Sequence, residues 1–431
     1  MRLAAVAMIV LSATSAGAAT LPRPIARATG WYDAGLAPIR GLTIGPIESA
    51  LHPGVGYGTP ACGRAMDRAV DEGATWIALT PFGRMWSTRT GEVDLSFEAP
   101  FADNREAIGR AIDQAHARGL AVMLVPHLWL EAGGWRGELE PGAPPDVKDA
   151  EGRYVERGRA TEAALAAFTR SYRRFVLAWA DVAEAHSVEL MSIGVELRSW
   201  VTSARARDEL HGLIADVRGR YRGLLTYGAN WDDVDDAWML SELDVIGINA
   251  FYPLADVAGA GRKELMEGGA RVAAKVRALG EAWHKPVLFT EVGYTARPDP
   301  AVRPWEWPDT MHGVRVDEHA QAEAYRAVLA GVLDERAFAG FFAWRAFADP
   351  DDVSQEPPWG FPVHGKEAEL VLRDAFASRW AGDPWAPMWT VFDAAAHGWP
   401  GAAWHFPRLW PAEEATHEVA RWAARPYPAA P

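Results

Sequence analysis

Glu196 and Glu291 are the first candidates for chemistry in this chain, because each ends a short apolar run that is typical of a strand buried on both faces. A carboxylate at such a position is costly to desolvate unless it serves a site or has a partner. Either glutamate alone could be a structural ion-pair partner. Two of them, at the ends of strands that lie nearly opposite each other in a closed sheet, favour a functional interpretation.

Two carboxyl groups that face each other are what hydrolysis of a glycosidic bond requires. One must be held protonated to donate to the leaving oxygen, and the other must be ionised to attack the anomeric carbon. A separation of about 5–5.5 Å leads to retention and a wider gap to inversion. The sequence does not give this distance. It contains neither a His-Glu-x-x-His zinc motif nor a Gly-x-Ser-x-Gly nucleophile elbow.

The composition limits the class of protein further. The chain has 431 residues, 49% of them apolar, and a formal charge of −14, which argues against a nucleic-acid binder or a basic membrane-surface protein. Cys62 is the single cysteine, so no internal disulfide and no cysteine-rich zinc site can form. We expect no metal and no cofactor. The 21 tryptophans suit sugar-stacking surfaces as well as cores.

The two ends of the chain differ in composition from its middle. Arg2, the apolar stretch Leu3–Leu11 and the small residues Ala16–Ala18 predict a signal peptide over residues 1–18, and hence a secreted or periplasmic protein without a membrane span. Residues 38–380 are predicted to form one domain. Residues 381–431 are rich in Pro and Trp and are predicted to be an irregular extension packed on that domain.

Short apolar runs without polar alternation recur along the domain, and amphipathic helical patterns separate them. The runs are Leu42–Gly45, Thr75–Thr80, Leu120–Pro126, Leu190–Glu196, Gly223–Ala229, Asp244–Ala250, Pro286–Glu291 and Gly340–Trp344. This alternation predicts an α/β fold, a (β/α)8 TIM barrel. The alternative is an open doubly wound sheet, but the glycines of Gly54–Gly58 do not have the spacing of its phosphate loop.

Two capping residues mark predicted helix starts: Thr59, which precedes Pro60, should cap one helix, and Asp103 can cap the next. The longest helix is predicted to begin near Thr161. The helix that follows Thr161 should bury a stripe of large apolar side chains: Leu165, Phe168, Tyr172, Phe175, Val176 and Trp179.

Four stretches of the sequence resemble glycoside hydrolase family 113, a family of bacterial TIM-barrel β-mannanases. They are Pro126-His127 with Gly134–Gly137, then Ile193–Leu197, then Leu225–Trp231 leading to Asp244–Pro253, and finally Phe289–Tyr294. The resemblance covers about residues 40–380. It implies that Glu196 is the general acid/base and Glu291 the nucleophile of a double displacement with retention. The sequence departs from the family pattern at Val195, where the wider clan has Asn, and at Ala346, where a second aromatic is expected.

Seven further residues complete the expected substrate site, each at or after a predicted strand end: His127, Trp135, Arg136, Asn230, Trp231, Tyr252 and Trp344. Tyr252 would hydrogen-bond the nucleophile, and Trp344 would be the floor under the reacting sugar; the alternatives are a rim aromatic and core packing. The acidic segment Asp232–Asp236 lacks the calcium-loop pattern and is interpreted as a solvated helix start.

The leading hypothesis is a secreted, monomeric, retaining β-glycoside hydrolase that acts on an oligo- or polysaccharide, as an endo-β-1,4-mannanase does. A retaining β-glycosidase of other sugar specificity is one alternative. Another is a barrel that binds glycans without catalysis, which the departures at Val195 and Ala346 motivate. A third is an assembly protein whose Trp-rich C-terminal extension mediates contacts.

Overall fold

The structure is a computed structural model, and it describes residues 38–45, 54–308, 311–352, 354–378 and 380. The predicted signal peptide (1–18) and the predicted C-terminal extension (381–431) lie outside the described residues. Among the described helices, none combines the length and the apolar character that a membrane crossing requires.

Eight parallel strands close into a barrel, which confirms the predicted fold class and excludes the open sheet. Each strand overlaps one predicted apolar run. The strands are β1 (Ile39–Gly45), β2 (Trp76–Leu79), β4 (Ala121–Leu124), β8 (Leu190–Val195), β9 (Leu224–Asn230), β10 (Ile246–Asn249), β11 (Val287–Val292) and β12 (Phe338–Phe347). β1 pairs with both β2 and β12, so the sheet has no free edge.

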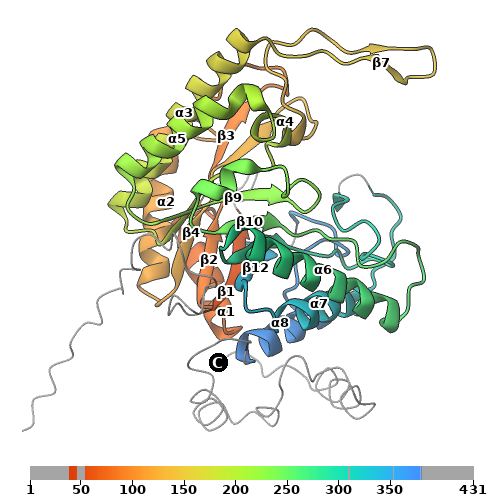
Figure 1. Cartoon of the computed structure of the whole chain (residues 1–431). Coiled ribbons are helices and arrows are strands. Elements are labelled where there is room, and N and C mark those ends of the chain that lie inside the picture. Colours follow the sequence, from red (N-terminus) through yellow and green to blue (C-terminus); the bar gives the residue numbers. More distant parts are fainter. Residues whose placement is uncertain (1–37, 46–53, 309–310, 353, 379, 381–431) are drawn as a thin grey trace, which may run out of the picture.

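Helices surround the barrel (Figure 1). The longer ones are α1 (Pro60–Asp71), α2 (Phe101–His116), α3 (Glu162–Ala185), α5 (Arg207–Arg220), α6 (Arg262–Trp283), α7 (Glu318–Val332) and α8 (Glu367–Ala377). Thr59 caps α1 as predicted, and α3 begins at the predicted place, where Thr161 caps it. The prediction that Asp103 caps a helix is wrong: α2 begins two residues earlier, after Pro100, and Asp103 lies in its first turn.

Short elements extend one side of the barrel beyond the C-terminal ends of its strands. β3 (Phe82–Met85) and β5 (His127–Leu130) follow β2 and β4 and pair in parallel. The next loop holds the one-turn helix η2 (Arg136–Glu138) and the hairpin of β6 (Val147–Lys148) and β7 (Tyr154–Glu156), which projects from the body (Figure 1). Together with α4 (Arg198–Val201), these elements form a wall beside the barrel opening.

The barrel interior is filled with apolar side chains, and Val195 is one of them, in contact with a cluster that includes Met123, Leu288 and Phe342. Between barrel and helices, the predicted stripe of α3 is buried along its whole length. Trp179, Trp200 and Trp380 are among the fully buried side chains. Part of the tryptophan excess is therefore structural.

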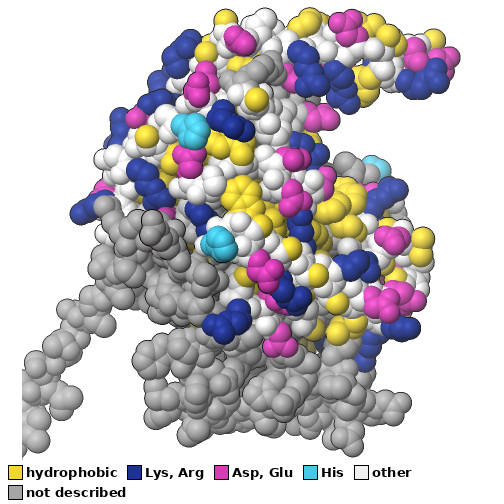
Figure 2. Space-filling view, viewed as in Figure 1, with side chains coloured by type: hydrophobic (Ala, Val, Ile, Leu, Met, Phe, Trp, Pro, Cys, Tyr) yellow, Lys and Arg dark blue, Asp and Glu magenta, His cyan; other side chains and the backbone are white. Residues whose placement is uncertain are grey.

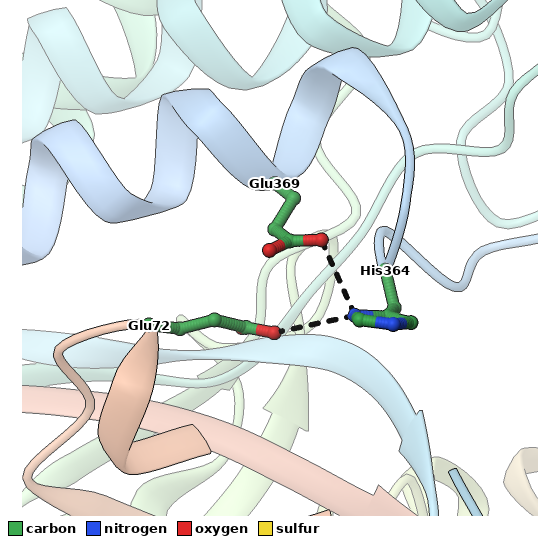
Figure 3. A group of neighbouring side chains, drawn as sticks. All are labelled: Glu72, His364 and Glu369. Atoms are coloured by element: carbon green, nitrogen blue, oxygen red, sulfur yellow. Dashed lines mark ion pairs between the residues drawn. The ribbon is translucent and has the colours of Figure 1, made fainter. Parts of the chain in front are cut away.

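A charged cluster joins the end of α1 to the start of α8 (Figure 3). His364 Nδ1 lies 3.2 Å from a carboxylate oxygen of Glu369 and 3.7 Å from one of Glu72, and both carboxylates are buried. The pKa of His364 is raised to about 9, first by its hydrogen bond to Glu369. Arg373 also pairs with Glu369, at 3.0 Å. The cluster therefore fastens the start of α8 to the end of α1.

Candidate active site

The two predicted catalytic glutamates converge on a third residue, Asn249, which ends β10. Its Nδ2 donates to Oε1 of Glu196 at 3.2 Å, and Asn249 is the register partner of Glu291 in the neighbouring strand β11. Glu196 immediately follows β8, and Glu291 lies in β11, with β9 and β10 between the two strands. The C-terminal ends of barrel strands carry the chemistry in this fold, and here they bring both carboxyl groups to one amide.

The backbone places Glu196 in an unusual conformation. Its φ is 56°, which lies in the left-handed region that non-glycine residues rarely adopt. The chain thus turns sharply as it leaves β8, while the Glu196 N–H still donates to the Gly228 carbonyl at 2.9 Å. Local strain of this kind is held in place by its surroundings, and active sites are where it concentrates.

Asn249 was not among the site residues predicted from the sequence. Thr290 fixes its orientation by donating from Oγ1 to Oδ1 at 2.9 Å, which leaves the amide N–H groups for the carboxylates. Gly228 provides the space, because a Cβ at that position would lie 3.0 Å from both Asn249 Oδ1 and Val195 Cγ2. The polar side chain of Asn249 near the end of the apolar run Asp244–Ala250 was the feature of the sequence that could have indicated it. Val195 itself is core, so the clan's asparagine has no direct replacement at position 195.

Trp135 and Arg136 surround the other oxygen of Glu196. Trp135 Nε1 donates to Oε2 at 3.4 Å, and Arg136 Nη2 lies 3.4 Å from the same atom. Arg136 is itself held by the Leu128 carbonyl, at 3.1 Å. The guanidinium of Arg198 lies 4.7 Å from the centroid of the Trp135 ring and stacks on it. The structure thus brings three predicted site residues together: Glu196, Trp135 and Arg136.

Glu291 is more enclosed, with 6% of its surface exposed. Burial raises its pKa well above the ordinary value, and the charge of Glu196 adds to the effect, whereas Arg136 and Arg345 oppose it. His127 Nε2 lies 3.5 Å from Oε1 of Glu291. Burial first, and then the same two arginines, hold the pKa of His127 well below its usual value.

Trp344 and Arg345 lie in the second half of β12, beside His127 and Glu291. The Trp344 ring stacks on that of His127 with centroids 6.4 Å apart, and its indole N–H has no hydrogen-bond partner among the described residues. The peptide bond between Trp344 and Arg345 is cis. Arg345 donates from Nε to Glu356 at 2.9 Å in a pair that is 3% and 1% exposed. The departure from the family pattern at Ala346 was seen in the sequence, but the buried cation of Arg345 beside it was not predicted.

The remaining predicted residues have other contacts. Asn230 ends β9. Its backbone N–H donates to Asp233 at 2.9 Å and its side-chain amide donates to the same carboxylate at 3.4 Å, so Asn230 stabilises the turn after β9. The Tyr252 hydroxyl has no hydrogen-bond partner in the described part of the chain, so the expected bond to Glu291 is not formed. The reason is packing, because the Tyr252 ring lies against Trp231 and Phe289.

The interpretation of Asp232–Asp236 as a solvated helix start is wrong. The segment is a turn, and the 3-10 helix that follows begins at Trp238. Asp232 and Asp233 both bind the guanidinium of Arg198, and Asp235 pairs with Lys275. Arg198 therefore connects the turn after β9 with Trp135, which contacts Glu196.

A closed barrel with two carboxyl groups at the C-terminal ends of its strands, and aromatic rings beside them, defines a site of the glycoside hydrolase type. The model of Glycoside Hydrolase Family 113 matches residues 52–355, and the chain belongs to this family. It is therefore a glycoside hydrolase. No curated protein sequence gives a significant match.

Solved structures agree with the family assignment. The GH113 β-mannanase AaManA from Alicyclobacillus acidocaldarius, in complex with ManMIm, is 25% identical, with a TM-score of 0.63 over 79% of this chain and 98% of that one. A GH113 β-1,4-mannanase solved as a complex is 22% identical, with a TM-score of 0.64 over 80% of this chain and 100% of that one. A family 5 mannosidase from Rhizomucor miehei shares the fold at 13% identity, with a TM-score of 0.53 over 79% of this chain and 93% of that one.

Proposed function

We propose that this chain is a secreted or periplasmic, monomeric, retaining β-glycoside hydrolase that cleaves β-1,4-mannan internally. The observation that carries the proposal is that Asn249 joins the two glutamates, through its bond to Glu196 and its pairing with Glu291. Two family 113 structures that resemble this chain are β-mannanases, which supports mannan as the substrate. The N-terminal pattern of Arg2, Leu3–Leu11 and Ala16–Ala18 supports export.

The reaction proceeds in two displacements. Glu196, protonated, gives its proton to the glycosidic oxygen while the Glu291 carboxylate attacks the anomeric carbon; the C–O bond to the leaving sugar breaks, and a glycosyl ester forms on Glu291. Glu196, now ionised, removes a proton from water. The water oxygen then attacks the same carbon and releases Glu291, with net retention.

The surroundings of the two glutamates differ. Trp135, Arg136 and Asn249 hold the Glu196 carboxyl in place through both of its oxygens. Glu291 must be ionised to attack; burial and the charge of Glu196 raise its pKa, and the positive charges of Arg136 and Arg345 oppose that rise. Trp344 stacks on His127, which faces Glu291, and an aromatic ring at this place suits contact with a sugar.

The test combines substrate, stereochemistry and variants. Purified protein is incubated with β-mannan, β-glucan, β-xylan and β-galactan, and NMR records the anomer formed first. We expect short mannooligosaccharides in the β configuration, and loss of product formation with Glu291→Ala. An α product formed first would exclude retention. Cleavage of another glycan alone would assign a different sugar specificity, and binding without any cleavage would favour the non-catalytic barrel.

A further inference from the structure

The surface beside the site carries a tryptophan that the mechanism does not use. Trp305 is 47% exposed, although large apolar side chains are normally covered. Its ring stacks on that of Trp231, with centroids 5.4 Å apart and planes 23° from parallel. Because one face of the indole lies on Trp231, the exposed area belongs to its edge and its other face.

Residues 293–308, which follow β11 and include Trp305, are tied to their surroundings. The Ala301 carbonyl accepts the N–H of Leu254 at 2.8 Å, which ties this loop to the one after β10. Arg297 Nη2 donates to Glu306, the neighbour of Trp305, at 2.9 Å. The exposed ring is therefore held in one place and does not owe its exposure to a loose loop.

Trp305 is connected to the site through Trp231. Trp231 directly follows β9, and its ring lies 5.7 Å from that of Tyr252, which follows β10. Trp231 also packs against the apolar cluster that contains Trp344 of β12. Trp231, Tyr252 and Trp305 follow the C-terminal ends of the neighbouring strands β9, β10 and β11. Figure 2 shows a hollow below the projecting β6–β7 hairpin, with hydrophobic side chains along its border.

We propose that Trp231 and Trp305 form a platform that binds one sugar of a β-linked hexopyranose chain by stacking, away from the bond that is cleaved. This inference rests on the proposed function and deepens it. The flat apolar face of such a pyranose matches an exposed indole, and the neighbouring Arg297 and Glu306 supply polar groups for hydroxyls. A fixed ring loses little entropy on binding. The platform accounts for internal cleavage, since it binds a chain that extends beyond the reacting sugar.

The test compares Trp305→Ala with the wild-type chain on substrates of different length. For a mannohexaose we expect KM to rise about 10-fold, which corresponds to about 1.4 kcal/mol of binding. For an aryl mannoside, whose single sugar occupies only the reacting position, we expect less than a twofold change. Trp305→Phe should restore most of the long-chain affinity. The matched control is Val257→Ala, since Val257 is also an exposed apolar side chain, at 69%, in a neighbouring loop.

Equal effects of Trp305→Ala on the long and the short substrate, or no effect on either, would overturn the platform. Failure of the proposed function itself gives a different result, because the wild-type chain would then cleave none of the glycans. In that case calorimetric titration with mannohexaose decides. Binding that weakens about 10-fold in Trp305→Ala supports the platform. Equal binding by both proteins, or binding by neither, rejects it.

Discussion

Replacing Arg345 with Met should change both the stability and the pH profile of the enzyme. Arg345 donates to Glu356 inside the protein, where the two side chains are 3% and 1% exposed. Glu356 Oε2 also accepts the N–H of Phe361, at 2.7 Å. In Arg345→Met the Glu356 carboxylate keeps its burial but loses its counter-charge.

The expected loss follows from that burial. Breaking a fully buried ion pair costs about 3–5 kcal/mol, because the remaining charge is desolvated without compensation. A domain of this length has an unfolding entropy of roughly 0.7 kcal/mol per degree, so Tm should fall by about 4–7 °C. The double variant Arg345→Met/Glu356→Gln removes both charges and should recover most of the loss. A double-mutant cycle by thermal unfolding measures the coupling between the two side chains.

The pH profile gives the functional half of this prediction. The charge of Arg345 lowers the pKa of Glu291. Without it that pKa rises further, and the acidic limb of kcat/KM, which reports ionisation of the nucleophile in the free enzyme, moves to higher pH. An unchanged acidic limb in Arg345→Met would refute this electrostatic argument, and a Tm within a degree of the wild type would refute the energetic one.

Three further predictions follow from single side chains. Glu196→Gln should slow cleavage of mannooligosaccharides by about 10²–10⁴-fold. The rate of the first step on aryl glycosides with acidic leaving groups should fall much less, because such a leaving group needs no proton. Equal losses on both substrates would contradict the role of Glu196 as the acid. Burial raises the pKa of Glu291, so its ionisation removes stability as pH rises through the folded-state pKa. Glu291→Gln should therefore melt at a higher temperature than the wild type at neutral pH, and the difference should vanish below the ordinary pKa of glutamate. Plots of Tm against pH that run parallel for the two proteins would disprove this. The pKa of His364 is raised to about 9, so its ion pair with Glu369 contributes to the free energy of unfolding, by roughly 1 kcal/mol after solvent screening of a half-exposed ring. This contribution is complete below the usual pKa of histidine and is lost as pH rises through about 9. His364→Gln should lower Tm at pH 6 and not at pH 10, and a constant difference would argue against the ion pair.

The barrel was predictable because its signals are local. Each of the eight strands is an apolar run without polar alternation, which is the pattern of a strand covered on both faces. The caps at Thr59 and Thr161 are equally local, since a side-chain oxygen there accepts a backbone N–H of the following turn. The positions of Glu196 and Glu291 followed from the ends of two such runs.

The contacts around the glutamates could not be predicted, because they depend on which way side chains point across the barrel. Asn249 and Glu196 are 53 positions apart, and their bond requires the closed order of the strands and the space that Gly228 provides. Tyr252 has the predicted position at a strand end, but the packing of its ring against Trp231 and Phe289 takes its hydroxyl away from the expected bond. Position along the sequence fixes the strand end and not the rotamer.

The most direct test of the central claim is covalent trapping. A 2-deoxy-2-fluoro mannoside with an acidic leaving group allows the first displacement but slows the second, so a retaining enzyme accumulates its glycosyl ester. Mass spectrometry of the digested protein should find one added fluoroglycosyl group on the peptide that contains Glu291, and none in Glu291→Gln. An adduct on Glu196, or turnover of mannan by a protein in which no adduct ever forms on Glu291, would contradict the assignment.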